Sequence, residues 1–85
     1  RNVDLSHSEL HFVDFSNANL SNANFADADI EGAFFYRCIL KGAKNLDGAK
    51  GLEKSIFIDV VVSKDQKRII EQKTDAGINS FVVRG

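Results

Sequence analysis

Large apolar residues recur at every fifth position through the first half of the chain. These positions are Leu5, Leu10, Phe15, Leu20, Phe25, Ile30, Phe35 and Leu40. A small or β-branched residue stands two positions before each of them, and Asp, Asn or Glu fills the intervening position as far as Asp29. Helices repeat apolar positions about every 3.6 residues and strands about every 2, so a period of five fits neither. A fixed period of this kind is typical of a solenoid, a coil built from repeats.

The spacing inside each unit predicts which side chains face the interior. The small and the large residue are two apart, so both point to the same side of a short extended segment. If the chain turns after each unit, these two side chains lie inside the coil and the other three lie outside. We therefore expect the eight large residues to form the core ladder. Cys38 occupies one of the small inward slots, where a free cysteine packs as a small apolar residue.

The unit reads small–Asp/Asn–Leu/Phe–x–x, most plainly from Ala18 to Ile30. This pattern resembles the pentapeptide-repeat family. The resemblance implies a mainly β fold, a right-handed quadrilateral β-helix with about 20 residues in each coil. Residues 1–45 would then form about two coils of the β-helix, followed by an irregular last coil and a short C-terminal α-helix. The chain begins inside the pattern, so we expect Arg1 to be a cut, the start of a visible fragment, or a surface that something else covers.

The five-residue period breaks after Ala43. Glycines loosen the backbone there, and β-branched residues follow from Ile56 to Val62. We therefore expect residues 46–62 to form the irregular last coil and an extended segment that leads off the coil.

A capping α-helix is predicted over residues 63–77. Ser63 and Gln66 have the spacing of a capping box, and Gly77 is suited to end the helix. Few of its residues are apolar, so we expect it to cover the open C-terminal edge of the coil as a lid. The C-terminal tail, residues 78–85, is expected to pack back against the coil.

Composition narrows the function classes. The chain has 85 residues, a formal net charge of −1 and one cysteine, which cannot form an internal disulfide. Its apolar runs are too short for a membrane span. It lacks the basic patch with interleaved aromatic residues that nucleic-acid binding requires. We therefore expect no nucleic-acid partner and no span across a membrane.

The strongest candidate for a metal site is the alternation of His7, Glu9 and His11. In the five-residue unit these residues fall at three different outward positions separated by a corner, so their side chains are not expected to converge as zinc ligands do. Ser8 faces inward by register and has no candidate base beside it. No catalytic, cofactor-binding or metal-binding residues are predicted, and the chain is expected not to be an enzyme.

In the second coil, the outward position before the large residue no longer always carries Asp, Asn or Glu. Phe34 and Ile39 replace the expected Asp or Asn, Tyr36 also faces outward, and Arg37 and Phe12 extend the cluster. Exposed apolar clusters usually mark an interface. The alternative is that the chain's own tail covers Phe34 and Ile39. These five residues are the candidate interface.

We therefore expect a structural or protein-interaction module, a scaffold or small subunit that docks on a larger assembly such as a photosynthetic complex. End-to-end stacking at the uncapped N-terminal coil is a further expected contact. The alternative is a DNA mimic that binds topoisomerases, as some pentapeptide-repeat proteins do, but this needs a long and strongly acidic rod. The segments Phe57–Val60, Asp65–Gln66 and Gly77–Asn79 together resemble the tails of plant thylakoid-lumen pentapeptide proteins, which favours the thylakoid lumen or plastid over a bacterial cytoplasm.

Overall fold

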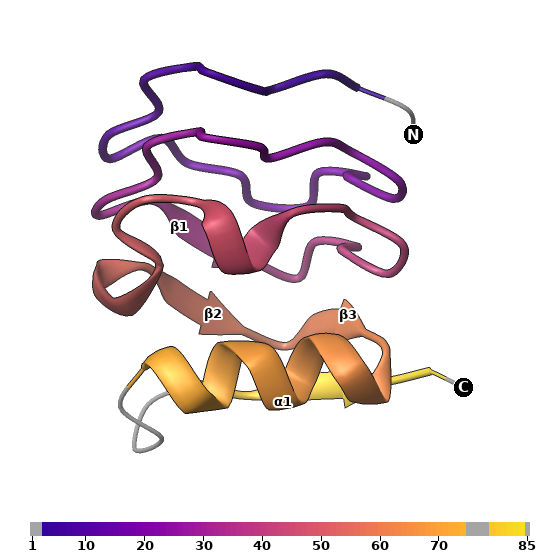
Figure 1. Cartoon of the computed structure of the whole chain (residues 1–85). Helices are drawn as coiled ribbons and strands as arrows, with labels where there is room; N and C mark the ends of the chain where they lie inside the picture. Colours follow the sequence, from indigo (N-terminus) through magenta and orange to yellow (C-terminus); the bar gives the residue numbers. More distant parts are fainter. Residues whose placement is uncertain (1–2, 75–78, 85) are drawn as a thin grey trace.

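The computed structural model describes residues 3–74 and 79–84. From the N-terminus the chain winds through stacked turns, and α1 lies across the opposite end of the stack (Figure 1). Two short 3-10 helices, η1 and η2, interrupt the third turn. The elements are β1 (Phe34–Tyr36), η1 (Leu46–Gly48), η2 (Leu52–Lys54), β2 (Ile56–Ile58), β3 (Val60–Val62), α1 (Lys64–Lys73) and β4 (Phe81–Val83).

Parallel backbone pairing joins each turn of the chain to the next. The first and second turns are paired at four points, each joining residues twenty positions apart: Asp4↔Asn24, Glu9↔Asp29, Asp14↔Phe34 and Asn19↔Ile39. Around each point the bonds run in both directions, as where Asn24 N–H donates to Val3 O and Leu5 N–H donates to Asn24 O, each at 2.9 Å. The five-residue sequence unit therefore occupies one side of a turn, and four units complete the turn.

The third turn corrects one sequence-based expectation. We expected residues 56–62 to lead off the coil, but β2 pairs in parallel with β1, and Val61 pairs with Ile39. The pairing distance grows from twenty residues at Asn24↔Lys44 to twenty-two at Phe34↔Ile56. The 3-10 helices η1 and η2 lie between these two points and take up the additional residues. The register is thereby restored, and β2 and β3 continue the coil.

The corners of the first turns share an unusual backbone conformation. Every fifth residue has a positive φ, as in the left-handed region: His7, Phe12, Asn17, Asn22, Asp27, Gly32, Arg37 and Gly42. Asn, Asp and Gly adopt this conformation at the lowest cost, which accounts for their frequency in this slot.

The Asp or Asn before each large residue stabilises the turn that follows it. The Oδ1 atom accepts a hydrogen bond from the backbone N–H two residues later, at 2.9 Å for Asp14 and Ser16 and at 3.1 Å for Asn24 and Ala26. Such local bonds are the reason that Asp and Asn favour turns. The outward polar slot therefore has a structural role that does not depend on a partner.

The interior is an apolar column. Phe25, Ile30, Phe35 and Leu40 are fully buried and Leu20 is nearly so. Leu5, Leu10 and Phe15 are half-buried, because among the described residues a neighbouring turn covers the first turn on one side only. One side of the coil carries a column of four rings, Phe15, Phe35, Phe57 and Phe81. The first three are stacked, with the centroids of Phe35 and Phe57 4.7 Å apart and their planes 2° from parallel, and the Phe81 ring is tilted by 36° against that of Phe57.

The C-terminal segment closes the lower part of the stack. A capping box at Ser63 and Gln66 starts α1, and the helix ends at Lys73, earlier than expected. Gly77 and Ile78 lie outside the described residues. The helix buries Ile70 and packs against η1, η2 and β4. The strand β4 pairs in parallel with β3, so the described tail extends the ladder. Within residues 3–74 and 79–84, no helix is long and apolar enough to cross a membrane.

Candidate interaction surface

The outer face of β1 and β2 is apolar. Alternate residues of a strand point to opposite faces, so the buried Phe35 and Phe57 place Phe34, Tyr36, Ile56 and Ile58 outside. The parallel register sets Phe34 beside Ile56 and Tyr36 beside Ile58. The adjoining side of the coil continues this surface with a second outward column, whose members pair in the order Ile39, Val61, Val82. We name these seven residues the apolar platform.

Ring stacking fixes the aromatic part of the platform. The rings of Phe34 and Tyr36 lie 5.8 Å apart between centroids, with planes 7° from parallel. The guanidinium carbon of Arg37 lies 5.1 Å from the centroid of the Tyr36 ring. A cation in this position is attracted to the face of the ring. Arg37, Tyr36 and Phe34 therefore form one ordered cluster.

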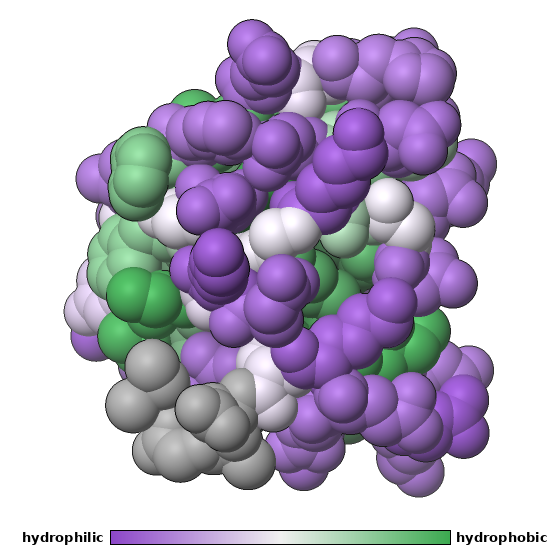
Figure 2. All heavy atoms as spheres, turned by 60° about the vertical axis from the view of Figure 1, so that its left-hand side comes forward, coloured by the Kyte–Doolittle hydropathy of each residue, from purple (hydrophilic) through white to green (hydrophobic). Residues whose placement is uncertain are grey.

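Part of the platform is open to solvent. The exposed fraction is 38% for Ile39, 36% for Ile56 and 37% for Val82, while Phe34 and Tyr36 are half-buried. Most of the surface in Figure 2 is hydrophilic, and apolar residues gather along its left edge.

The described tail does not lie over the outer face of the platform. Ser80 N–H donates to Phe57 O at 2.9 Å, and Asn79 Oδ1 accepts from Phe57 N–H at 3.2 Å. These bonds place residues 79–84 beside β2 and β3, as the next layer of the stack. In this layer β4 places Val82 next to Val61 in the outward column.

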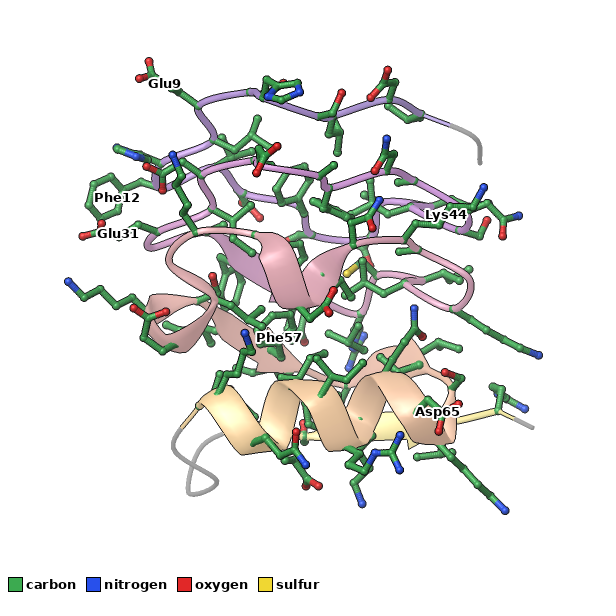
Figure 3. The ribbon with its side chains drawn as sticks, in the orientation of Figure 1. Glu9, Phe12, Glu31, Lys44, Phe57 and Asp65 are labelled. Atoms are coloured by element: carbon green, nitrogen blue, oxygen red, sulfur yellow. The ribbon has the colours of Figure 1, made fainter. Side chains whose placement is uncertain are left out.

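Phe12 occupies a different place from the other candidate interface residues. It projects from a corner of the first turn (Figure 3) and is 77% exposed. Its φ is 59°, a costly conformation for a bulky residue. A Cβ atom at Gly32 would lie 2.5 Å from the Phe12 ring, so the ring covers the corner of the turn below. The Phe12 ring meets that of His11 edge to face, at 6.4 Å between centroids, and among the described residues it makes no ring contact with the platform.

Several platform residues lie outside the sequence-predicted interface. Ile56, Ile58, Val61 and Val82 belong to the third and fourth rungs, where the twenty-residue spacing no longer holds. The signal that could have found the first three is the alternation of outward and buried apolar residues within Ile56–Ile58 and again within Val60–Val62.

The polar side of the molecule contains ion pairs between turns. His11 Nε2 lies 2.7 Å from Asp29 Oδ2, and His7 Nδ1 lies 3.8 Å from Asp27 Oδ2. The bond to Asp29 raises the pKa of His11, and the same bond lowers the pKa of Asp29. Among the described residues, no three His, Cys, Asp or Glu side chains group as ligands for a metal ion. Burial raises the pKa of the Cys38 thiol to about 12, so this thiol stays protonated.

The turns are stacked in fixed register, and each side of a turn is built from five residues. This arrangement is that of a repeat protein, in which a regular coil carries the outward-facing side chains. The family model of pentapeptide repeats matches residues 1–22 and 18–50, with eight copies of the repeat. This chain therefore belongs to the pentapeptide-repeat family, which confirms the resemblance drawn from the sequence. Comparisons with curated proteins and with solved structures gave no match.

Proposed function

We propose that this protein is a non-enzymatic interaction module that docks on a protein partner through the apolar platform. In this proposal it serves as a scaffold or small subunit of a larger assembly, on a coil of the right-handed, quadrilateral form implied by the family. The family match supports the general class, because pentapeptide-repeat proteins are generally structural or interaction proteins. The observation that carries the platform assignment is its contrast with the equivalent slots of the first turn.

The contrast between polar and apolar residues in equivalent slots indicates that folding of the coil does not require apolar residues there. Asp14 occupies the slot that Phe34 and Ile56 occupy in later turns, and Asn19 occupies that of Ile39 and Val61. All these slots face outward, and the polar versions give the turn an additional side-chain bond, as Asp14 does with Ser16. Phe34 and Ile39 forgo that local bond and leave apolar surface in water. An aromatic cluster held on a rigid ladder loses little conformational freedom on binding, which favours its use as an anchor.

The DNA-mimic alternative receives no support from the charge pattern. A mimic of DNA requires negative charge along the whole coil. In the columns that begin with Asp4 and Glu9, the third turn carries Lys44 and Lys50. The sign of the charge therefore changes along the coil, and we do not adopt this function.

The test replaces the platform residues with the residue types of the first turn, as Phe34→Asp with Ile39→Asn. Asp and Asn are compatible with these slots, so circular dichroism and the melting temperature should stay close to those of the original protein. Removal of an interface anchor commonly costs about 2 kcal/mol, close to a thirtyfold loss of affinity. We expect proteins captured by the original chain, identified by mass spectrometry and then purified, to bind the double variant at least that much more weakly.

The matched control is Asn24→Asp, which adds one negative charge in the equivalent slot on a polar side of the coil. Its Oδ1 atom can still accept from Ala26 N–H, as Asn24 does. The control should bind the captured partner as the original chain does. Equal binding by the platform variant, in a partner assay with purified components, would contradict the docking role of the platform.

A further inference from the structure

The outer face of β1 and β2 consists of two rows of different shape. The strand β1 contributes the stacked rings of Phe34 and Tyr36, and β2 contributes the branched side chains of Ile56 and Ile58. The parallel register places the two rows side by side on one side of the stack (Figure 1). We name these four residues the β1–β2 face. It is one side of the apolar platform, and the column that contains Ile39 lies on the adjoining side.

Two opposite charges stand at one edge of this face, at the corner that leads to the adjoining side. The register that pairs Tyr36 with Ile58 sets Arg37 beside Asp59, and both of these corner residues are exposed. Neither forms an ion pair with a residue that the structure describes. The Arg37 guanidinium lies over the Tyr36 ring, and Asp59 Oδ1 accepts from Ser80 Oγ at 3.2 Å. Each charge is therefore available to an oppositely charged group outside the chain.

Each row of the face is complementary to the other row. Flat rings lie beside branched aliphatic chains, and a positive corner lies beside a negative corner. A half-turn about an axis that runs parallel to the strands, midway between β1 and β2, exchanges the two rows. If a second copy is placed face to face by this rotation, its β2 row lies opposite the β1 row of the first copy, and its Asp59 lies opposite Arg37. The face is therefore complementary to itself in shape and in charge, as a two-fold contact requires.

The other axis in the plane of the face runs along the stack, and it gives no such match. A half-turn about that axis keeps each row opposite itself. It moves Arg37 and Asp59 of the second copy to the opposite edge of the face, beyond the column of Phe34 and Ile56. The charges of the two copies would then lie apart. The charges therefore select the axis that is parallel to the strands.

We propose that the β1–β2 face binds the same face of a second copy, with the two coils antiparallel and Arg37 of each copy opposite Asp59 of the other. This inference rests on the proposed function, because it names the occupant of one side of the apolar platform. The same surface is used on both copies, so each charge pair occurs twice and the assembly closes at two copies. The adjoining side, which carries Ile39, stays outside this contact.

Sedimentation velocity of the purified chain, from micromolar to millimolar concentration, tests the self-association. We expect the mass to rise from one copy to two and no further. Arg37→Asp alone sets two carboxylates opposite each other, and Asp59→Arg alone sets two guanidinium groups opposite each other. Each variant should weaken the dimer by at least about tenfold, because like charges then meet at two points of the interface.

Two restorations distinguish this geometry from a general effect of charge. The double variant Arg37→Asp with Asp59→Arg exchanges the two charges and should recover the dimer. An equal mixture of the two single variants should form a mixed dimer, because each contact then joins a carboxylate to a guanidinium group. The two corners have φ values of 53° and 52°, so each already holds the conformation that the exchanged residue needs. The circular dichroism spectra should therefore match that of the original chain.

The matched control is Asp27→Arg, the same substitution at a different corner of the coil with a φ of 54°. This variant should dimerise as the original chain does. A single-copy mass at every concentration overturns the self-association and leaves the β1–β2 face to a different protein. Growth beyond two copies also overturns it, as does a mixture of the single variants that associates no better than its components.

Two further variants separate this inference from the proposed function. Phe34→Asp should weaken self-association by at least about tenfold, because it places a carboxylate against Ile56 of the second copy. Ile39→Asn should leave it unchanged, and a loss of the dimer in that variant contradicts the assignment to the β1–β2 face. Self-association is measured on the purified chain alone, whereas the proposed function is measured with a captured partner. The two assays therefore report their failures separately.

Discussion

At the corners of the coil, residues with positive φ set the direction of the chain, and the cost depends on the side chain. Asn17, Asn22 and Asp27 tolerate this conformation, whereas His7 and Phe12 pay the ordinary penalty of about 1–2 kcal/mol for a residue other than glycine. Phe12 offsets part of this cost by covering Gly32 with its ring. Backbone conformation thus accounts for Asn, Asp and Gly at most corners, and ring packing reduces the cost at Phe12.

Gly51→Ala should be strongly destabilising. Gly51 has a φ of 79°, and a Cβ atom there would lie 2.6 Å from the backbone Cα of Glu31, which cannot move aside without shifting the second turn. The conformational penalty of about 1–2 kcal/mol and the overpacking of about 1–3 kcal/mol add, so we expect a loss of about 2–5 kcal/mol in urea unfolding. Gly48→Ala is the control, because nothing lies within 4 Å of its added Cβ. Equal stability of the two variants would contradict this account of the third turn.

The contact between His11 and Asp29 makes the joint between the first two turns sensitive to pH. The bond raises the pKa of His11, so its stabilising contribution is complete below the ordinary value of 6.5 and is lost as pH rises through the raised pKa. The same bond lowers the pKa of Asp29, whose contribution is present above the ordinary value of 3.8 and is lost as pH falls through the lowered pKa. The pair contributes fully between these two ordinary values.

The melting temperature should therefore fall between about pH 5 and about pH 8 by more in the original chain than in Asp29→Asn. The asparagine oxygen can still accept from Glu31 N–H, as Asp29 Oδ1 does, so the turn itself is retained. The difference between the two proteins isolates the ion pair from other titrating groups. An identical pH dependence of melting in both would show that the pair contributes nothing to the joint.

At the scale of elements, α1 is joined to the coil through one buried polar side chain. Gln66 Nε2 donates to Leu40 O at 2.7 Å and to Ala43 O at 3.2 Å, while its Oε1 accepts from Ser63 N–H in the capping box. One side chain therefore starts the helix and satisfies carbonyls of the second turn. Ile70 provides the apolar contact one turn of helix further along.

Gln66→Glu should separate these two roles. The carboxylate keeps an oxygen for the capping box but loses both donors and places a charge against two carbonyl oxygens. Leaving buried polar groups unsatisfied costs about 1–3 kcal/mol, and we expect a loss of about 2–3 kcal/mol in the free energy of unfolding. Gln72→Glu, which makes the same change at an exposed position of α1, should be nearly neutral. Equal effects of the two would mean that Gln66 does not fasten the helix to the coil.

At the scale of the whole molecule, the regular part of the coil could be predicted and the irregular part could not. The period of five predicts the pairing of Leu5 with Phe25 and of Phe15 with Phe35, because a repeat fixes both the side and the register. The third turn could not be predicted, because η1 and η2 add residues and change the pairing distance. The sequence contains no local pattern that indicates where the regular pairing resumes. The same shift hid Ile56 and Ile58 from the predicted interface. The pairing of β4 with β3 joins residues about twenty apart across a helix, a non-local contact without a sequence period.

Because the first turns are paired at a fixed spacing of twenty residues, the coil can gain or lose length there only by whole turns. Loss of twenty residues, such as 24–43, would bring Asp4 over Lys44 in the outward column and Phe15 over Phe57 in the aromatic stack, with each pair still of compatible type. Loss of five or ten would instead rotate every remaining side against the ones below, setting the outward slots of polar sides over those of the apolar platform. Lengthening by an unequal exchange between related genes would meet the same restriction. The height of the coil therefore changes only by whole turns. Single residues can be gained or lost at the corners that hold η1 and η2.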